Sequence, residues 1–136
     1  LVSWCLGHLA EYVPPEEYDE KYRKWEFSDL PILPEEWRLS VAKDKKVQFT
    51  VLKKLLNRKD VEYVVNGCDA GREGELIFRR VYEVSGSCLP IKQIWISSME
   101  DTAIREGFAH LKDGAEYQNL YGAAVCRAKA DFTFLA

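Results

Sequence analysis

The chain has 136 residues and a net charge of −3, with 47% hydrophobic and 12% aromatic residues. This length fits one compact domain and the start of a second, and the hydrophobic content excludes an intrinsically disordered chain. No segment approaches the roughly 20 apolar residues that cross a bilayer, and no signal peptide opens the chain, so we expect a cytoplasmic protein with no membrane segment.

The four cysteines follow no metal-binding or disulfide pattern, because they are widely separated and show no C-x-x-C spacing. Scattered cysteines indicate reduced thiols rather than a zinc site or a disulfide framework. They are Cys5, Cys68, Cys88 and Cys126.

The predicted elements alternate between strands and helices. Val47, Val51 and Leu55 recur at helical spacing, for example, whereas residues 61–65 are rich in β-branched and aromatic side chains, which is typical of a strand. This alternation predicts an α/β fold with a mostly parallel sheet sandwiched by helices. In chain order we expect a strand over 2–9, a surface connection over 13–37, a short strand over 37–41, a helix over 45–58, a strand over 61–65, a helix over 72–84, a strand over 93–97, a helix from 99 to 111 that Ser97 or Ser98 caps, and a helix over 116–135.

Basic residues concentrate between residues 43 and 59. Seven basic side chains stand there against Asp44 alone, although the whole chain is acidic. A local basic face can hold phosphates in an acidic protein, but the solvated side of an amphipathic helix is the simpler interpretation.

A short acidic stretch follows the strand predicted over 61–65. Asp69 comes directly after that strand, and Glu73 and Glu75 fall in the loop or in the first helical turn. Ligands of α/β folds bind where strands end and loops lead into helices, and carboxylates are the oxygen ligands that Mg²⁺ takes. The sequence therefore makes this stretch a candidate magnesium site.

The acidic stretch has two other interpretations. Acidic residues in a first helical turn commonly complement the helix dipole without binding a metal. A nucleotide-binding site would require a G-x-x-x-x-G-K-[ST] or G-x-G-x-x-G loop, and neither pattern occurs in the chain.

The stretch over residues 69–77, Asp-Ala-Gly-Arg-Glu-Gly-Glu-Leu-Ile, resembles the acidic signature of the toprim domain of type IA DNA topoisomerases, particularly the bacterial topoisomerase III group. The resemblance implies a toprim domain over residues 1–112 that lacks its first strand, and the start of the next, helical DNA-groove domain over 113–136. The abrupt ends of the chain also favour a fragment. Further segments that resemble the family, in the expected order, are residues 4–9, 14–18, 30–34, 95–99, 103–105 and 123–131.

The resemblance implies that an acidic cluster binds Mg²⁺ and organises the cleavage site. The family pattern Asp-x-Asp-x-Glu maps onto Asp69, Gly71 and Glu73, so one acid is replaced by glycine. Glu75 is the candidate substitute ligand, and a further family glutamate would precede Leu1. We therefore expect Glu73, Asp69 and Arg72 to be catalytic, and Asp69, Glu73 and Glu75 to bind the metal weakly.

The resemblance also implies contacts with DNA. Arg72 matches the arginine between the acids and is expected to contact phosphate or carboxylate. Independently of the resemblance, Arg72, Arg79 and Arg80 lie close to the acidic stretch in sequence and are candidate phosphate contacts. His8 lies in the Gly-His-Leu segment, where a DNA contact and a structural role stay open. Arg127 and Asp131 match a pair on the helix that holds single-stranded DNA, although an i,i+4 salt bridge is the simpler explanation.

None of the seven tyrosines has the sequence context of the family's nucleophile. The resemblance therefore implies an ATP-independent enzyme that cleaves one DNA strand through a tyrosyl-phosphate link, with the tyrosine on another domain, so we expect this polypeptide alone to be inactive. Its partners would be single-stranded DNA and the remaining domains of the same enzyme. The enzyme would be associated with the nucleoid or encoded by a mobile element. The alternatives are another toprim enzyme, such as a primase or a nuclease, and a non-catalytic α/β module.

Overall fold

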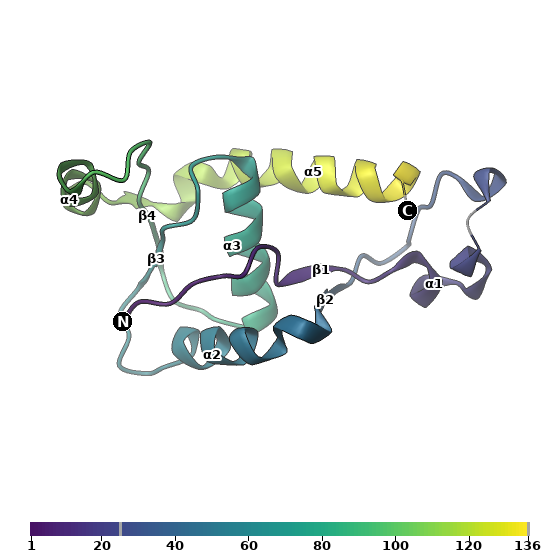
Figure 1. The fold of residues 1–136 in the computed structure, drawn as a ribbon, viewed down its shortest axis with the longest axis horizontal. Coiled ribbons are helices and arrows are strands. Elements are labelled where there is room, and N and C mark those ends of the chain that lie inside the picture. Colours follow the sequence, from purple (N-terminus) through teal and green to yellow (C-terminus); the bar gives the residue numbers. More distant parts are fainter. Residues whose placement is uncertain (25, 136) are drawn as a thin grey trace.

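A computed structural model describes residues 1–24 and 26–135 of the chain (Figure 1). Within these residues, no helix is both long and apolar enough to cross a membrane. The strands are β1 (Ala10–Tyr12), β2 (Leu39–Val41), β3 (Val64–Asn66), β4 (Ile91–Gln93) and β5 (Lys112–Asp113). The helices are α1 (Pro15–Tyr18), α2 (Lys46–Leu56), α3 (Arg72–Ser85), α4 (Asp101–Ala109) and α5 (Gln118–Leu135).

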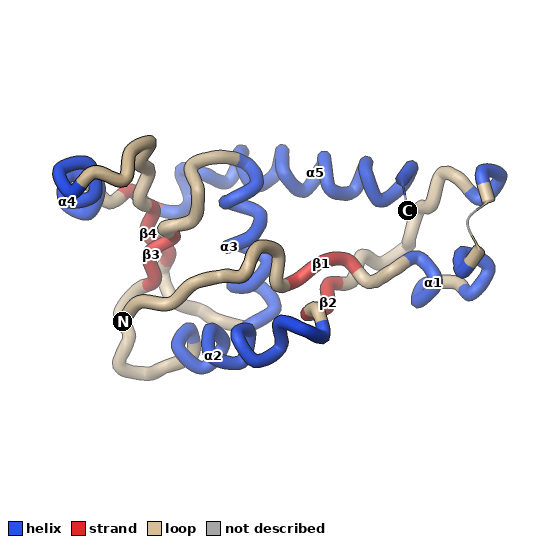
Figure 2. Tube along the Cα trace, in the orientation of Figure 1, coloured by secondary structure: helices blue, strands red, loops and turns tan. Residues whose placement is uncertain are grey.

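The strands form two small sheets. β1 and β2 pair antiparallel, with Ala10 opposite Val41. β3 and β4 pair in parallel, and β5 adds to β4 in the antiparallel direction, so the three-stranded sheet is mixed. The predicted α/β class is confirmed, and the parallel pair is the one that the crossover helix α3 connects (Figure 2).

Helix α3 stands at the centre of the fold, with α2 near one of its ends and α5 near the other (Figure 1). The core between α2 and α3 contains Leu56 and Val81, with Leu9 buried against them at 0% exposure. Polar contacts fix the ends of the two helices, since Asn57 Nδ2 donates to Ser85 O at 3.0 Å. The C-terminal ends of α2 and α3 therefore meet, and the loop that precedes α3 lies at the opposite end.

The prediction of a strand over residues 2–9 is wrong. These residues pair with no strand among those that the structure describes, and strand pairing begins at Ala10. The side chain of Gln48 instead holds the segment, through Nε2 to Trp4 O at 2.6 Å. The segment is mostly apolar, as expected for a buried strand, but an apolar run does not by itself supply a hydrogen-bonding neighbour.

The connection over residues 13–37 packs against the end of α5. Ile32 is 4% exposed, and its backbone nitrogen donates to Thr133 O at 2.9 Å. The rings of Trp37 and Phe132 meet edge to face at 5.1 Å between centroids. Helix α5 therefore contacts both α3 and the long connection.

Candidate functional site

The acidic stretch lies in the loop between β3 and α3, at the carboxyl end of β3, as predicted. The loop backbone approaches the first turn of the helix so closely that a Cβ atom on Gly74 would lie 2.8 Å from the Asp69 nitrogen and still nearer to the Asp69 carbonyl oxygen. Glycine at position 74 therefore allows the backbone of Asp69 to lie directly on α3.

The side chains of Asp69 and Arg72 are exposed, and neither makes a hydrogen bond or an ion pair within residues 1–24 and 26–135. They lie at the N-terminal end of α3, where unpaired backbone N–H groups and the helix dipole favour anions. Both side chains are therefore free to meet a ligand.

Glu73 is 75% exposed and contacts His8, a residue 65 positions earlier in the chain. The hydrogen bond from His8 Nε2 to Glu73 Oε1 is the largest cause of a lowered pKa of Glu73. Burial acts in the opposite direction, and the nearby charges of His8, Arg127 and Arg80 lower the pKa further. Glu73 is therefore held as a carboxylate, the form in which it can bind a cation.

His8 is held through its ring, which contacts Glu73, and through its backbone. Its carbonyl oxygen accepts a hydrogen bond from Lys45 Nζ at 3.1 Å. Its Nδ1 atom is buried and has no hydrogen-bond partner among the described residues. These contacts give His8 a structural role beside Glu73, and its predicted contact with DNA stays a prediction.

Glu75 has different surroundings, with its side chain 1% exposed. Its Oε1 atom accepts from Arg79 Nε at 2.8 Å, and its Oε2 atom accepts from Asn66 Nδ2 at 3.1 Å. Arg79 also donates from Nη2 to Gly114 O at 2.6 Å. Direct metal ligation by Glu75 would therefore require these partners to separate.

Two phosphate contacts suggested by sequence alone are replaced by internal ones. Arg79 pairs with Glu75, and Arg80 is 6% exposed with its guanidinium over the ring of Tyr12 at 4.8 Å. The i,i+4 spacing of Glu75 and Arg79 could have predicted their ion pair. No spacing predicted the contact of Arg80 with Tyr12, because Tyr12 lies far away in the sequence.

Arg127 and Asp131 are both exposed on α5, and within the described part of the chain they form no ion pair with each other. Arg127 lies near enough to Glu73 to lower the pKa of its carboxyl. The structure therefore brings Arg127 toward the acidic loop and does not tie it to Asp131.

A groove of about 450 Å³ lies between the β1–β2 pair, α3 and α5. Tyr121, Val125 and Lys129 line it from α5, at the four-residue spacing of one helix face. Burial raises the pKa of Tyr121 and of Tyr12 in this groove. Arg127 and Asp131 lie on a different face of α5 and do not line the groove.

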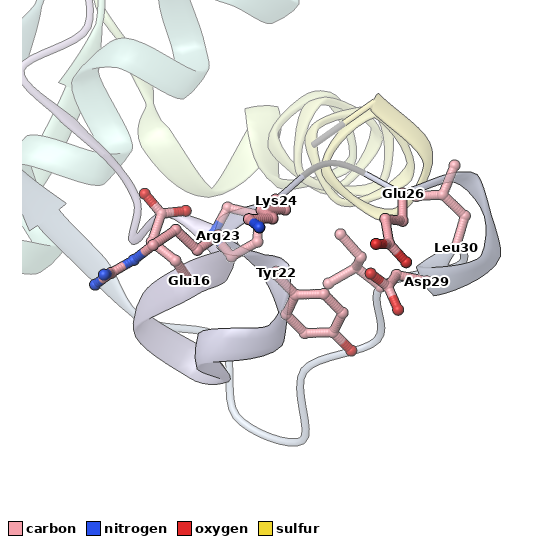
Figure 3. A pocket seen from close by; sticks show the side chains of 9 residues that line it. Glu16, Tyr22, Arg23, Lys24, Glu26, Asp29 and Leu30 are labelled. Carbon is pink, nitrogen blue, oxygen red and sulfur yellow. The ribbon is translucent and has the colours of Figure 1, made fainter.

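A second, smaller hollow of about 210 Å³ lies beside α1, far along the chain from the acidic loop (Figure 3). Glu16, Tyr22 and Asp29 are among its lining residues. It shares no lining residue with the acidic loop and is not part of the candidate site.

Within residues 1–24 and 26–135, no three histidine, cysteine, aspartate or glutamate side chains converge on a common point as a metal cluster. A cation at the loop would therefore take at most two ligands from the exposed pair, Asp69 and Glu73. Mg²⁺ commonly binds through one or two carboxylates and keeps several waters, so the donor set fits this ion.

Comparison with known proteins shows a close relation to one group. Over 132 residues the chain is 49% identical to DNA topoisomerase 3 of Bacillus thuringiensis (strain Al Hakam), 48% to that of Bacillus subtilis (strain 168) and 46% to that of Shouchella clausii (strain KSM-K16). Each match covers 97% of this chain, and the chain spans 18% of the length of each relative. No family model matches the chain. The chain is thus a homologue of a segment of bacterial DNA topoisomerase 3, and the predicted relation is confirmed.

Proposed function

We propose that this chain is the magnesium-binding part of a type IA DNA topoisomerase, which cleaves one DNA strand through a tyrosyl-phosphate link, passes the other strand and reseals the break without ATP. The observation that carries the proposal is the exposed acidic loop at the N-terminus of α3, in a segment homologous to DNA topoisomerase 3. The exposed carboxylates of Asp69 and Glu73, neither of which caps the backbone of α3, favour a site over a helix that is merely capped by acids.

Asp69 and Glu73 would hold the metal ion. Both side chains are exposed, and the lowered pKa of Glu73 keeps it charged. When bound, Mg²⁺ supplies positive charge that orients the phosphate and stabilises the leaving 3′-oxygen. Glu75, predicted as a third ligand, anchors Arg79 and Asn66 in this proposal.

The other charged side chains would bind and orient DNA. Arg72 lies free at the same helix end and would pair with a phosphate oxygen. His8 would hold the carboxylate of Glu73 in place. Arg127 would contact phosphate on the single strand, with Asp131 orienting it.

The nucleophilic tyrosine would belong to another domain of the whole enzyme. We therefore expect no nicking or relaxation of supercoiled plasmid when this chain is incubated with Mg²⁺. Gel electrophoresis of the plasmid checks this expectation, and a Mg²⁺-dependent nicked or relaxed product would contradict it.

Binding of single-stranded DNA tests the proposal directly. We expect Mg²⁺ to strengthen binding of a fluorescent single-stranded oligonucleotide, because an ion held by Asp69 and Glu73 would neutralise the carboxylates that otherwise repel phosphate. The double substitution Asp69→Asn with Glu73→Gln should abolish the effect of Mg²⁺, as measured by fluorescence anisotropy. A matched control, Asp101→Asn with Glu106→Gln on α4, should retain it, and an equal loss in both variants would sink the proposal.

A further inference from the structure

Three exposed lysines share one side of α2. Lys46 and Lys53 are seven residues apart, about two turns, and Lys54 lies beside Lys53, so all three project from neighbouring positions of the helix surface. Leu52 and Leu56 occupy a different face and pack into the core. We call the three exposed lysines the α2 lysine face.

The α2 lysine face has no internal partner. Two other basic residues of this region are engaged, since Lys45 donates to His8 O and Arg58 pairs with Asp60 at 2.6 Å. Helix α2 contains no acidic residue, and its three exposed lysines form no ion pair among the residues that the structure describes. Their charges are therefore available to an outside partner.

The helix dipole does not account for this arrangement. A cation near a helix C-terminus is favourable, which suits Lys53 and Lys54, but a cation in the first turn is unfavourable. Lys46 nevertheless opens the helix, directly after Lys43 and Lys45. The same sign of charge at both ends of α2 indicates an extended anionic partner.

The end of the face that carries Lys53 and Lys54 lies at the far end of α3 from the acidic loop. The C-terminal ends of α2 and α3 meet at Asn57 and Ser85, whereas Asp69 lies before the first turn of α3 (Figure 1). The 14 residues of α3 make it about 21 Å long at 1.5 Å per residue. A polyanion at Lys53 and Lys54 would therefore present other phosphates than those that meet the acidic loop.

We infer that the α2 lysine face binds the phosphate backbone of double-stranded DNA, as a second contact beside the single strand at the acidic loop. The inference rests on the proposed function, which makes DNA the polyanion. Single-strand sites typically stack bases on aromatic rings, and the aromatic residue of α2, Phe49, packs toward the core. Lysines without such rings suit sequence-independent contact with the denser charge of a duplex.

The test compares two triple variants of the chain in binding a fluorescent duplex oligonucleotide at several salt concentrations. One variant combines Lys46→Gln, Lys53→Gln and Lys54→Gln, since lysine and glutamine have similar helix propensity. The control combines Lys21→Gln, Arg105→Gln and Lys112→Gln, which are exposed elsewhere and give the same net charge. Circular dichroism verifies that both variants fold.

We expect the α2 variant to bind duplex about tenfold more weakly at low salt, and its plot of log K against log salt to be shallower by about 0.9 per lysine removed. The control should stay near the wild type. Equal losses in the two variants, no loss in either, or binding to vesicles of anionic lipid without binding to duplex would each overturn the inference. If the lysine variant matches the wild type while the effect of Mg²⁺ on single strands persists, the inference fails and the proposed function stands.

Discussion

Glu73 and Glu75 are two residues apart and have opposite surroundings. A helix that begins at Arg72 places residues i and i+2 on different sides. Glu73 is therefore exposed beside His8, and Glu75 is buried between Arg79 and Asn66. The two carboxylates have separate tasks in the proposed enzyme, one at the metal and one inside the fold.

We expect Glu75→Ala to lower the free energy of unfolding by about 3 kcal/mol, because it leaves the Arg79 charge unpaired in a mostly buried position. Glu73→Ala is the matched control and should cost less than about 1 kcal/mol, since its side chain is exposed. Urea denaturation of both variants measures the difference. Equal losses would show that the buried pair contributes nothing beyond a surface contact.

His8→Ala should raise the pKa of Glu73 toward its usual value, because the hydrogen bond from His8 is the main cause of the lowered pKa. A carboxyl whose pKa is lower in the folded state stabilises the fold above its unfolded pKa, and this contribution is lost as pH falls through the folded pKa. The variant should therefore lose part of the pH dependence of stability in the acidic range.

Carboxyl-detected NMR titration measures the pKa of Glu73 in both proteins. Asp60 provides an internal reference, since Arg58 and not His8 lowers its pKa. An unchanged Glu73 pKa in the variant, or an equal shift of Asp60, would contradict the assigned role of His8.

At the scale of elements, the contact between the acidic loop and α3 depends on Gly74. Gly74→Ala would place a methyl group against the backbone of Asp69, and overpacking of this kind costs about 1–3 kcal/mol. Gly122→Ala in α5 meets nothing within 4 Å and should instead add about 0.5–1 kcal/mol of stability through helix propensity. Thermal unfolding of the two variants should shift in opposite directions, and a stabilised Gly74→Ala would refute the close approach.

The helices were more predictable from sequence than the strands. Helix α3 begins at the predicted residue, and α2 and α5 lie within the predicted ranges, because long apolar periodicities specify a buried face. Strands β3 and β4 are three residues long and are displaced from the predicted ranges. A short apolar run fixes neither register nor strand ends, because these depend on the neighbouring strand.

The sequence predicted where the candidate site lies, but it did not predict which side chains contact one another there. The loop after β3 followed from an α/β rule, and Asp69 and Glu73 lie there as expected. The contact of His8 with Glu73 spans 65 residues, and only the tertiary fold brings the two side chains together. The burial of Glu75 depends on β3 and on the segment at Gly114 packing against this side of α3, which the sequence does not show.

At the scale of the whole molecule, the acidic loop and the α2 lysine face are separate charged surfaces. The acidic loop and the α2 lysine face lie toward opposite ends of α3 (Figure 1), and the chain as a whole carries −3. A net charge near neutrality therefore conceals two charged surfaces, and we propose different partners for them: a metal ion with single-stranded DNA at the acidic loop, and a duplex backbone at the α2 lysine face.

Titration of the chain with Mg²⁺, followed by backbone amide NMR, tests the central claim most directly. We predict that the amide shifts of residues 69–75 move with Mg²⁺ and that Mn²⁺ broadens the same signals. In the variant with Asp69→Asn and Glu73→Gln, both effects should disappear while the remaining spectrum is preserved. Unchanged amide shifts with both ions, or equal effects in the double variant, would contradict a metal site at this loop.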